Sequence, residues 1–417
     1  MSPSPPSPLL ADLFNKECTL CGRCLQACPL FAATQREELS PRAKLFTAQM
    51  LDREDGALAE LARRPAEDLA ALCLGCGRCS EVCPQGLAAP ELAARIRSLH
   101  PGFSGWLWKT WMNSGDALWP AMSALSRFIP GLDPGKSTAQ GKGGPRSLAR
   151  AMSGRAARPV VPWLRPLGVS PANACADTRK AVLFAGCTAR RIRPNWVKAA
   201  QWFLDGLGLA GPVREPKWEC CGATLGHAGL RKQELEAHRR NLALWRELDR
   251  PLLVVICASC GHGLRAVAQD KDLDWAPGEA DLWAASVIWL ASLVGEVRAE
   301  VLENAPAKVR YHRPCHAGAS DPDQALLARL LGVRFAPGSG EACCGLGGVL
   351  QLAAPGLSRA VAADLWGKLG AEPGDQVLTG CSGCALQLAA TAPKDVAVGH
   401  WLEIFDLAPQ ARLAFAP

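Results

Sequence analysis

The chain has 417 residues, too many for one compact core, and this length predicts two to four domains. Its formal net charge of +7 is modest, so charge alone does not indicate a nucleic-acid partner. There is no run of 18 uncharged apolar residues, and the opening MSPSPPSPLLADLF lacks the basic start of a secretory signal. The chain has 19 cysteines, and we expect a cytoplasmic protein in which the clustered ones hold metal rather than form disulfides.

Two copies of the pattern C-x2-C-x2-C-x3-C-P lie in the first hundred residues. The first copy comprises Cys18, Cys21, Cys24 and Cys28, and the second comprises Cys73, Cys76, Cys79 and Cys83. In paired motifs of this kind the first three thiolates of a run bind one [4Fe-4S] cluster, and the fourth binds the other cluster. We therefore predict one cluster on Cys18, Cys21, Cys24 and Cys83, and a second cluster on Cys73, Cys76, Cys79 and Cys28.

A pair of zinc sites is the alternative for these eight cysteines. Zinc usually takes two ligands from each of two knuckles, which two identical runs of four cysteines fit poorly. The insert between the runs contains SPRAKLFTAQMLDRE and ALAELARRPAEDLAALC, both with helical periodicity. This region resembles the all-helical ferredoxin domain of respiratory dehydrogenase iron–sulfur subunits. We expect residues 1–99 to form such a ferredoxin domain.

Residues 100–178 carry little metal-binding chemistry. Large aromatic side chains gather in the first part of this segment: Trp106, Trp108, Trp111, Trp119 and Phe128. A stretch rich in glycine, proline and arginine follows. We interpret the segment as a helix that covers a neighbouring domain, followed by a linker. The alternative is a peripheral contact of residues 103–130 with the inner face of the cell membrane, because tryptophan suits an interface and arginine attracts anionic lipid.

A second cysteine repeat begins near residue 180. Each copy has a single cysteine, an adjacent pair followed by glycine, and a C-x2-C pair. The first copy comprises Cys187, Cys220, Cys221, Cys257 and Cys260, and the second comprises Cys315, Cys343, Cys344, Cys381 and Cys384. Repetition on this scale indicates duplicated domains, which we place at residues 179–304 and 305–417. We call them the first and second CCG domains, after their Cys-Cys-Gly motif.

The apolar runs AVLF, LLVVI and QVLT precede cysteines of these domains and alternate with helical patterns. Strands that alternate with helices predict an α/β fold with short parallel sheets, whose sites lie beyond the carboxyl ends of the strands. Gly222 and Gly345 would let the backbone pass close to a bound cluster. Five cysteines are one more than a cubane or a tetrahedral zinc needs, which favours an unusual cluster.

The order of two ferredoxin motifs and two CCG motifs resembles the heterodisulfide reductase catalytic subunits. It is also similar to the iron–sulfur subunits of glycolate oxidase, flavin-linked lactate dehydrogenases and anaerobic glycerol-3-phosphate dehydrogenase. The segment CTLCGRCLQACPLFAATQREELSPRAKLF, which contains Ser40-Pro41-Arg42, resembles the opening of the glycolate and lactate members. The resemblance implies a non-cubane [4Fe-4S] cluster on the five cysteines of each CCG domain.

Four histidines lie close to CCG cysteines in the sequence: His227, His262, His312 and His316. Each is a candidate hydrogen-bond donor to cluster sulfur, and His316 is also a candidate proton donor, while a purely structural role is the alternative. Cys175 matches no position of either repeat, and we expect it to be a free thiol without a role.

The sequence contains no G-x-G-x-x-G fingerprint for a flavin or a nicotinamide, so a partner must supply electrons. We expect the iron–sulfur subunit of a 2-hydroxy acid dehydrogenase that oxidises glycolate or lactate. It would take electrons from an FAD-containing subunit and pass them to a quinone or membrane carrier. The alternative is a catalytic disulfide reductase, with Cys221 and Cys344 at the reacting clusters. A zinc-bound scaffold without redox activity is a weaker third interpretation.

Overall fold

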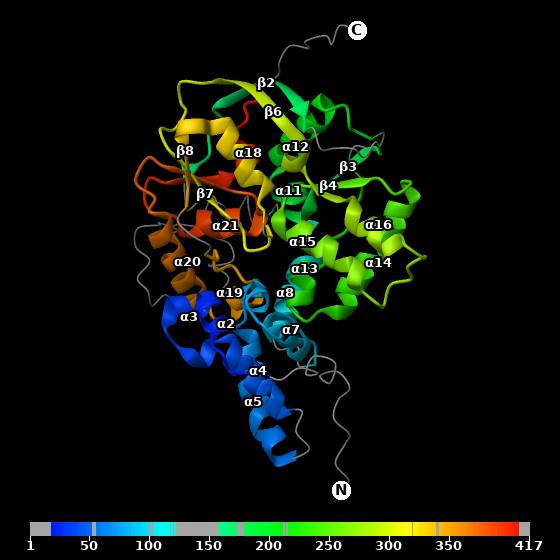
Figure 1. The fold of residues 1–417 in the computed structure, drawn as a ribbon, viewed down its shortest axis with the longest axis vertical. Helices are drawn as coiled ribbons and strands as arrows, with labels where there is room; N and C mark the ends of the chain where they lie inside the picture. Colours follow the sequence, from blue (N-terminus) through cyan, green and yellow to red (C-terminus); the bar gives the residue numbers. More distant parts are fainter. Residues whose placement is uncertain are drawn as a thin grey trace.

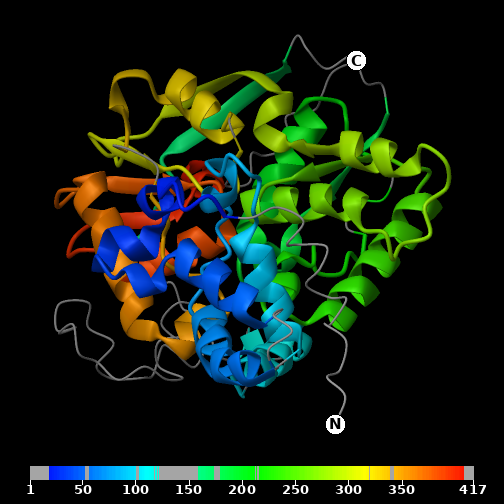
Figure 2. The same cartoon turned by 60° about the horizontal axis from the view of Figure 1, so that its bottom comes forward.

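The computed structural model describes residues 18–51, 56–99, 103–116, 118–119, 121, 158–172, 179–211, 213, 216–318, 320–338 and 342–407. A helical unit forms one end of the molecule, and the strands with their covering helices form the rest (Figure 1). In the turned view the helical unit lies across both the green and the orange parts of the ribbon (Figure 2). Cys175 and Phe128 lie outside the described residues.

The helical unit corresponds to the predicted ferredoxin domain. Its elements are α2 (Arg23–Ala27), α3 (Pro29–Thr34), η1 (Glu37–Leu39), α4 (Pro41–Leu51), α5 (Gly56–Ala71), α6 (Arg78–Glu81) and α7 (Ala89–Leu99). Side chains of α4, α5 and α7, among them Leu45, Ala66 and Ile96, form its apolar core together with Cys73 and Cys79. The structure therefore confirms an all-helical domain around the two ferredoxin motifs.

The first CCG domain contains a parallel sheet of order β3-β4-β5, formed by β3 (Ala181–Phe184), β4 (Leu252–Val255) and β5 (Val287–Trp289). Every residue of β3 and β4 is buried, as expected for strands covered on both faces. The accompanying helices are α11 (Gly186–Ile192), α12 (Pro194–Gly206), α13 (Ala223–His227), α14 (Arg231–Glu247), α15 (Ala258–Ala266), η4 (Val267–Gln269), α16 (Glu279–Ser286) and α17 (Leu290–Leu293).

The second CCG domain contains a five-stranded sheet of order β1-β10-β9-β7-β8, with all pairs parallel. Its strands are β1 (Arg158–Pro159), β7 (Val309–His312), β8 (Phe335–Pro337), β9 (Gln376–Thr379) and β10 (Ala397–His400). The helices are α18 (Pro322–Leu331), η5 (Gly332–Arg334), α19 (Val349–Ala353), α20 (Pro355–Leu369), α21 (Ser382–Thr391) and η6 (Trp401–Ile404). The predicted α/β class with parallel sheets is thus confirmed in both domains.

Two strands lie where the sequence indicates only a linker. β1 forms one edge of the five-stranded sheet, and β2 (Leu164–Pro171) pairs antiparallel with β6 (Val294–Val301). Both contain proline, which lacks an N–H donor and is confined to edge strands, so their sequences lack an ordinary strand signal. The segment before residue 179 therefore pairs with strands from both CCG domains, through β10 and β6, while the domain boundaries at 179 and 305 stay predictions.

The two CCG domains share their apolar cores. One core joins Val182 and Leu253 of the first domain to Val377 and Leu388 of the second. Burial of continuous apolar surface across the boundary stabilises one relative placement of the two domains. The loops that carry the cysteines of the two domains are consequently held in a fixed position relative to each other.

Helix α8 (Phe103–Asn113) packs against both CCG domains rather than standing free. Trp108 and Trp119 are buried in a cluster that includes Leu225 of the first domain and Val349 of the second. This packing agrees with the interpretation of the segment as a covering helix. Trp106 is 57% exposed. Within the described ranges no helix has both the length and the apolar character needed to cross a bilayer.

The ferredoxin domain is joined to the first CCG domain by Arg97 at the end of α7. Its guanidinium donates to the carbonyls of Cys73 (2.8 Å) and Ala71 (3.2 Å) and also to the carbonyl of His227, the last residue of α13. Gly229, with φ +75°, lies against the same helix end, and a Cβ there would be 2.5 Å from the backbone nitrogen of Ser98. This junction has no room for a larger residue.

We expect Gly229→Ala to destabilise this junction. The left-handed backbone costs alanine about 1 to 2 kcal/mol, and the backbone clash adds a further ~1 to 3 kcal/mol. The matched control is Gly208→Ala, where φ is +68° and no atom lies within 4 Å of the added Cβ. Thermal unfolding should show a lower midpoint for Gly229→Ala than for Gly208→Ala. Equal midpoints would contradict the close packing described here.

Candidate metal centres

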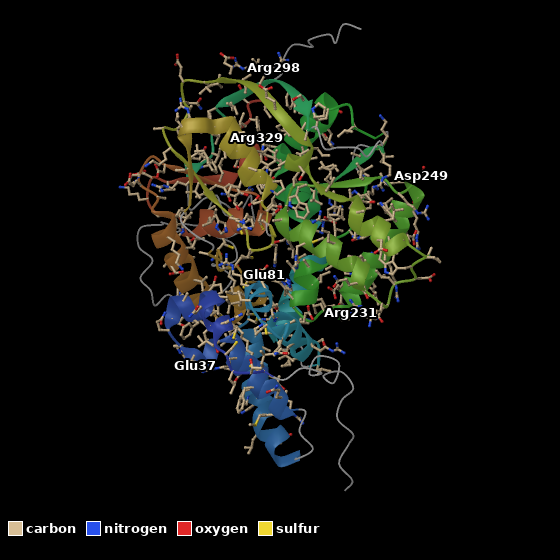
Figure 3. All side chains as sticks on the ribbon, in the orientation of Figure 1. Glu37, Glu81, Arg231, Asp249, Arg298 and Arg329 are labelled. Carbon is tan, nitrogen blue, oxygen red and sulfur yellow. The ribbon has the colours of Figure 1, made fainter. Side chains whose placement is uncertain are left out.

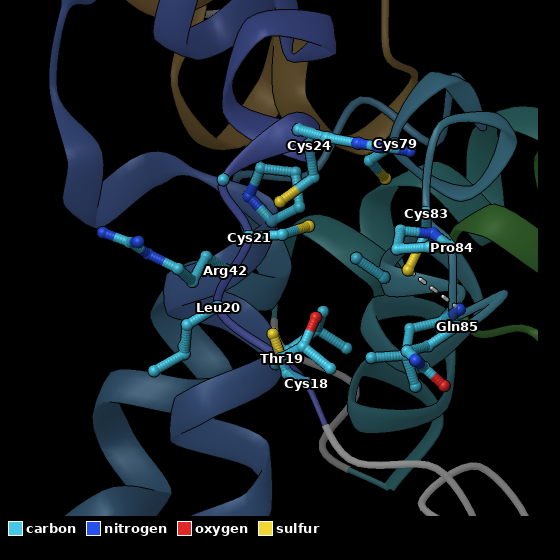
Figure 4. A pocket seen from close by; sticks show the side chains of 16 residues that line it. Cys18, Thr19, Leu20, Cys21, Cys24, Arg42, Cys79, Cys83, Pro84 and Gln85 are labelled. Atoms are coloured by element: carbon cyan, nitrogen blue, oxygen red, sulfur yellow. Dashed lines mark hydrogen bonds between the residues drawn. The ribbon is translucent and has the colours of Figure 1, made fainter.

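The first ferredoxin site is a pocket that opens to the surface (Figure 4). The sulfur atoms of its four predicted ligands point toward a common space between the loops: Cys18, Cys21, Cys24 and Cys83. Burial raises the pKa of the Cys24 thiol, and the neighbouring thiols of this group raise it further. Cys83, from the second motif, thus joins three cysteines of the first, as the spacing predicts.

Two backbone N–H groups favour thiolate at this site. The N–H of Leu87 donates to Cys83 Sγ at 3.4 Å. The pKa of Cys21, which is exposed, is lowered because the backbone N–H of Arg23 donates to its sulfur. Such donors are typical of loops that surround iron–sulfur clusters.

The second ferredoxin site is more deeply buried. Cys28, Cys73 and Cys79 all lie in apolar clusters of the core, and burial raises the pKa of Cys79 to about 12, with Cys73 and Cys28 adding to the rise. The ammonium of Lys44 is also buried here and donates to the carbonyl of Leu39. Burial lowers the pKa of Lys44, and the nearby thiols of this site oppose that shift. A cation beside a thiolate group offsets its negative charge.

Cys76 completes this second group and lies next to the second CCG domain. Burial raises its pKa well above the usual value, and the second largest contribution comes from the charge of Cys343. The charge of Cys76 in turn contributes to the raised pKa of Cys315. The second ferredoxin site is therefore adjacent to the thiols of the second CCG domain.

The five cysteines of the first CCG domain converge from three loops. Cys187 follows β3, Cys220 and Cys221 precede α13, and Cys257 and Cys260 lie at the start of α15 after β4. Their thiols form successive hydrogen bonds, from Cys187 to Cys220, Cys221 and Cys260. The thiols of Cys220 and Cys260 lower the pKa of Cys221 to about 5. The carboxyl ends of the strands thus hold the site, as predicted.

The second CCG domain repeats this arrangement. Cys315 follows β7, and Cys381 and Cys384 follow β9. Thiol contacts join Cys315 to Cys343, Cys344 to Cys384, and Cys384 to Cys381. Hydrogen bonds from Cys315 and Cys344 lower the pKa of Cys343 well below its ordinary value. Only 27 residues separate Cys315 from Cys343, against 32 between Cys187 and Cys220 in the first domain, and the five thiols nevertheless meet.

The glycines of the CCG motifs make a close approach that the sequence does not indicate. Both have left-handed backbones, with φ +84° at Gly222 and +82° at Gly345. A Cβ would lie 2.1 Å from Nε2 of His238 at Gly222, and 2.5 Å from the carbonyl oxygen of Ser358 at Gly345. The close approach is therefore to a neighbouring helix, and it fixes the direction of the adjacent cysteine pair.

The two CCG sites are in direct contact, which the sequence does not indicate. The thiol of Cys257 hydrogen-bonds with that of Cys381. The backbone N–H of Ser382 donates to Cys257 Sγ at 3.3 Å, and Ser259 Oγ lies 3.2 Å from Cys381 Sγ. Each domain thus places a hydrogen-bonding group on a cysteine of the other domain.

His316 connects these loops to the ferredoxin domain. Its Nδ1 lies 3.1 Å from Ser259 Oγ, and its Nε2 lies 3.3 Å from the carbonyl oxygen of Gly75. Glu81 lies where the helical unit meets the CCG domains (Figure 3), near enough for its charge to act on the ring of His316. The ring of His262 stacks on that of His316 with centroids 4.5 Å apart. Burial lowers the pKa of His262 to about 4 and of His227 to about 3, so both rings are neutral at pH 7.

The donor sets fit iron–sulfur clusters. All 18 cysteines in the described part of the chain are free thiols, even though they meet in groups of four or five. Convergent sulfur ligands with backbone N–H donors and a nearby cation match the surroundings of such clusters. The cysteines of the ferredoxin motifs and of both CCG motifs are the residues that would hold them.

Comparison with known proteins agrees with this arrangement. A family model described as a 4Fe-4S dicluster domain matches residues 15–87, and one described as a cysteine-rich domain matches residues 181–265 and again 309–389. Both descriptions fit the thiol groups found in the structure, and the chain binds iron–sulfur clusters.

Several curated proteins are similar over most of the chain. A probable glycolate oxidase iron-sulfur subunit of Bacillus subtilis is 25% identical over 90% of this chain and 88% of its own length. One subunit of the dihydromethanophenazine:CoB–CoM heterodisulfide reductase of Methanosarcina mazei is 24% identical over 83% of this chain and 81% of its own. Lactate utilization protein A of Shouchella clausii is 22% identical over 54% of this chain and 95% of its own.

The matched domains occur in the order that the cysteine motifs predict, and together they cover more than half of the chain. The chain therefore belongs to the iron–sulfur proteins that combine a 4Fe-4S dicluster domain with two cysteine-rich CCG domains.

Proposed function

We propose that this chain is the iron–sulfur electron-transfer subunit of a flavin-linked dehydrogenase for a 2-hydroxy acid, glycolate or lactate. It takes electrons from an FAD-containing subunit and passes them to a quinone or membrane carrier. The relatives support the general class, since they are subunits of oxidoreductases such as glycolate oxidase. Bound iron–sulfur clusters supply the ability to take up and release single electrons.

The observation that carries this proposal is the unbroken series of adjacent thiol groups. The first ferredoxin group reaches the surface at Cys21, and Cys24 contributes to the electrostatic surroundings of Cys79 in the second. Cys76 of the second lies beside Cys343, and Cys381 meets Cys257 of the last group. Four sites in series suit transfer between two distant partners, whereas a site for one reaction needs no such series.

The ligand assignment is part of the proposal. The first ferredoxin site would use Cys18, Cys21, Cys24 and Cys83, and the second would use Cys28, Cys73, Cys76 and Cys79. Each CCG domain would hold a non-cubane cluster on its five thiols. Burial of Lys44 beside the second ferredoxin site would favour its reduced state by offsetting negative charge.

A membrane contact through residues 103–130 is a further part of the proposal. Trp108 and Trp119 are buried, whereas Trp106 is exposed and would be able to meet lipid. This contact would place the chain on the inner face of the cell membrane, near a quinone.

Catalytic disulfide reduction is the second candidate function. It is favoured by the contact between Cys257 and Cys381, which brings the two five-cysteine groups together, and by the similarity to a heterodisulfide reductase subunit. In this case Cys221 and Cys344 would belong to the reacting centres.

The exchange of the fourth ligands between the ferredoxin motifs can be tested with Cys28→Ser. We expect it to alter the spin-resonance signal of the second ferredoxin site and to lower the iron content from about 16 per chain. Cys21→Ser should alter a different signal, because it holds the first site. Cys175→Ser is the matched control and should change neither. If Cys28→Ser and Cys21→Ser remove the same signal, the exchange is wrong.

The electron-transfer role predicts a flavoprotein partner. Anaerobic purification of the native complex should recover an FAD-containing protein together with this chain. Adding glycolate or lactate to that complex should then reduce the clusters, as measured by bleaching of visible absorbance. A chain that purifies without flavin, and whose clusters neither substrate reduces in the cell extract, would contradict the proposal.

The second candidate predicts that the isolated, reduced chain cleaves a small disulfide. Cys344→Ser should abolish this turnover while the ferredoxin spin-resonance signals remain, because Cys344 lies outside that domain. Turnover is measured as release of thiol. Full turnover by the variant excludes a reaction at the second CCG site, and no turnover by the unaltered chain favours the electron-transfer role.

A further inference from the structure

His312 is buried beside the cysteines of the second CCG domain. It is the last residue of β7, three positions before Cys315, and only 2% of it is exposed. A ring nitrogen of His312 and the sulfur atoms of Cys344 and Cys384 all lie within 4.8 Å of one another. The imidazole therefore lies within reach of the group that these thiols would hold.

The ring has an unused polar atom. Nε2 of His312 is buried and has no hydrogen-bond partner among the described residues. An unsatisfied buried polar atom is destabilising by roughly 1 to 3 kcal/mol, so native proteins rarely keep one without a partner. A neutral imidazole has one N–H donor that can serve such a partner. These observations indicate a partner other than the described residues.

The first CCG domain has no such group at the equivalent place. Its strand β3 ends at Phe184, three positions before Cys187, just as β7 ends at His312 before Cys315. Phe184 is fully buried and packs against Trp218 with ring centroids 5.6 Å apart. Phenylalanine offers no donor. The two otherwise similar sites thus differ in one polar contact.

We propose that His312 is a sixth contact of the second CCG site and donates its N–H to a sulfur of the cluster held there. Hydrogen bonds to sulfur stabilise the more negative, reduced state and raise the reduction potential. The second CCG cluster therefore has a higher potential than it would have without His312, and His312 contributes to a difference from the first. This inference rests on the proposed ligand assignment, because it requires a cluster on the five thiols of the second domain.

The test replaces His312 by the residue of the other domain. His312→Phe should lower the midpoint potential of one CCG signal in a titration of the whole protein monitored by spin resonance. The ferredoxin signals should keep their potentials, and the iron content should be unchanged. His312→Gln retains an N–H donor and should lower the potential less than His312→Phe. Equal potentials in the unaltered chain and in both variants overturn the inference.

A second measurement does not depend on the potential. Protein labelled with nitrogen-15 histidine should show a weak nitrogen coupling to the second CCG cluster, and His312→Phe should remove it. A strong coupling would mean that nitrogen binds iron directly and would overturn the donor role, as would no coupling at all.

Cys343→Ser distinguishes a failure of the ligand assignment from a failure of the role proposed for His312. If it lowers the iron content, the second CCG cluster exists, and an unchanged His312→Phe variant then refutes the role of His312 alone. If Cys343→Ser retains all its iron, the ligand assignment fails, and the inference fails with it.

Discussion

The structure depends on the convergence of thiols from segments far apart in the chain. Cys24 and Cys83 meet across the ferredoxin domain, Cys76 meets Cys343 between domains, and Cys257 meets Cys381 between the two sheets. Thiolates gathered in a buried space repel one another and lose hydration. Most cysteines in the described part of the chain accordingly have raised pKa values, Cys79, Cys260 and Cys384 among them. Metal binding removes that repulsion, so the folding of the loops is coupled to the loading of the clusters.

The remaining contacts keep these thiol groups at fixed separations. Arg97 ties the loop of Cys73 to the carbonyl of His227, and His316 bridges Gly75 and Ser259. Trp108 packs against both CCG domains, and the apolar core runs across their boundary. Rates of electron transfer fall steeply with separation, so a rigid junction suits the proposed role better than a flexible linker.

The sequence predicts much of this because cysteine spacing and strand–helix alternation are local patterns. The runs at Cys18 and Cys73, the two CCG repeats and the parallel strands at Ala181 and Leu252 follow from them. The strands at 158–159 and 164–171 are not predicted, because they contain proline, which is untypical of strands. The contact of Cys257 with Cys381 is not predicted either, because it depends on the packing of two domains. The sequence also does not decide between a structural role for His312 and a role as a donor to cluster sulfur. Only the fold shows that its Nε2 is buried without a partner among the described residues.

The paired hydrogen bonds of Ser259 and Ser382 have a consequence for the history of the chain. Each serine lies in one copy of the duplicated unit and hydrogen-bonds with a sulfur in the other. The surroundings of Cys257 and of Cys381 are therefore completed by the other copy. The two copies are therefore coupled at these positions and cannot diverge there independently of each other.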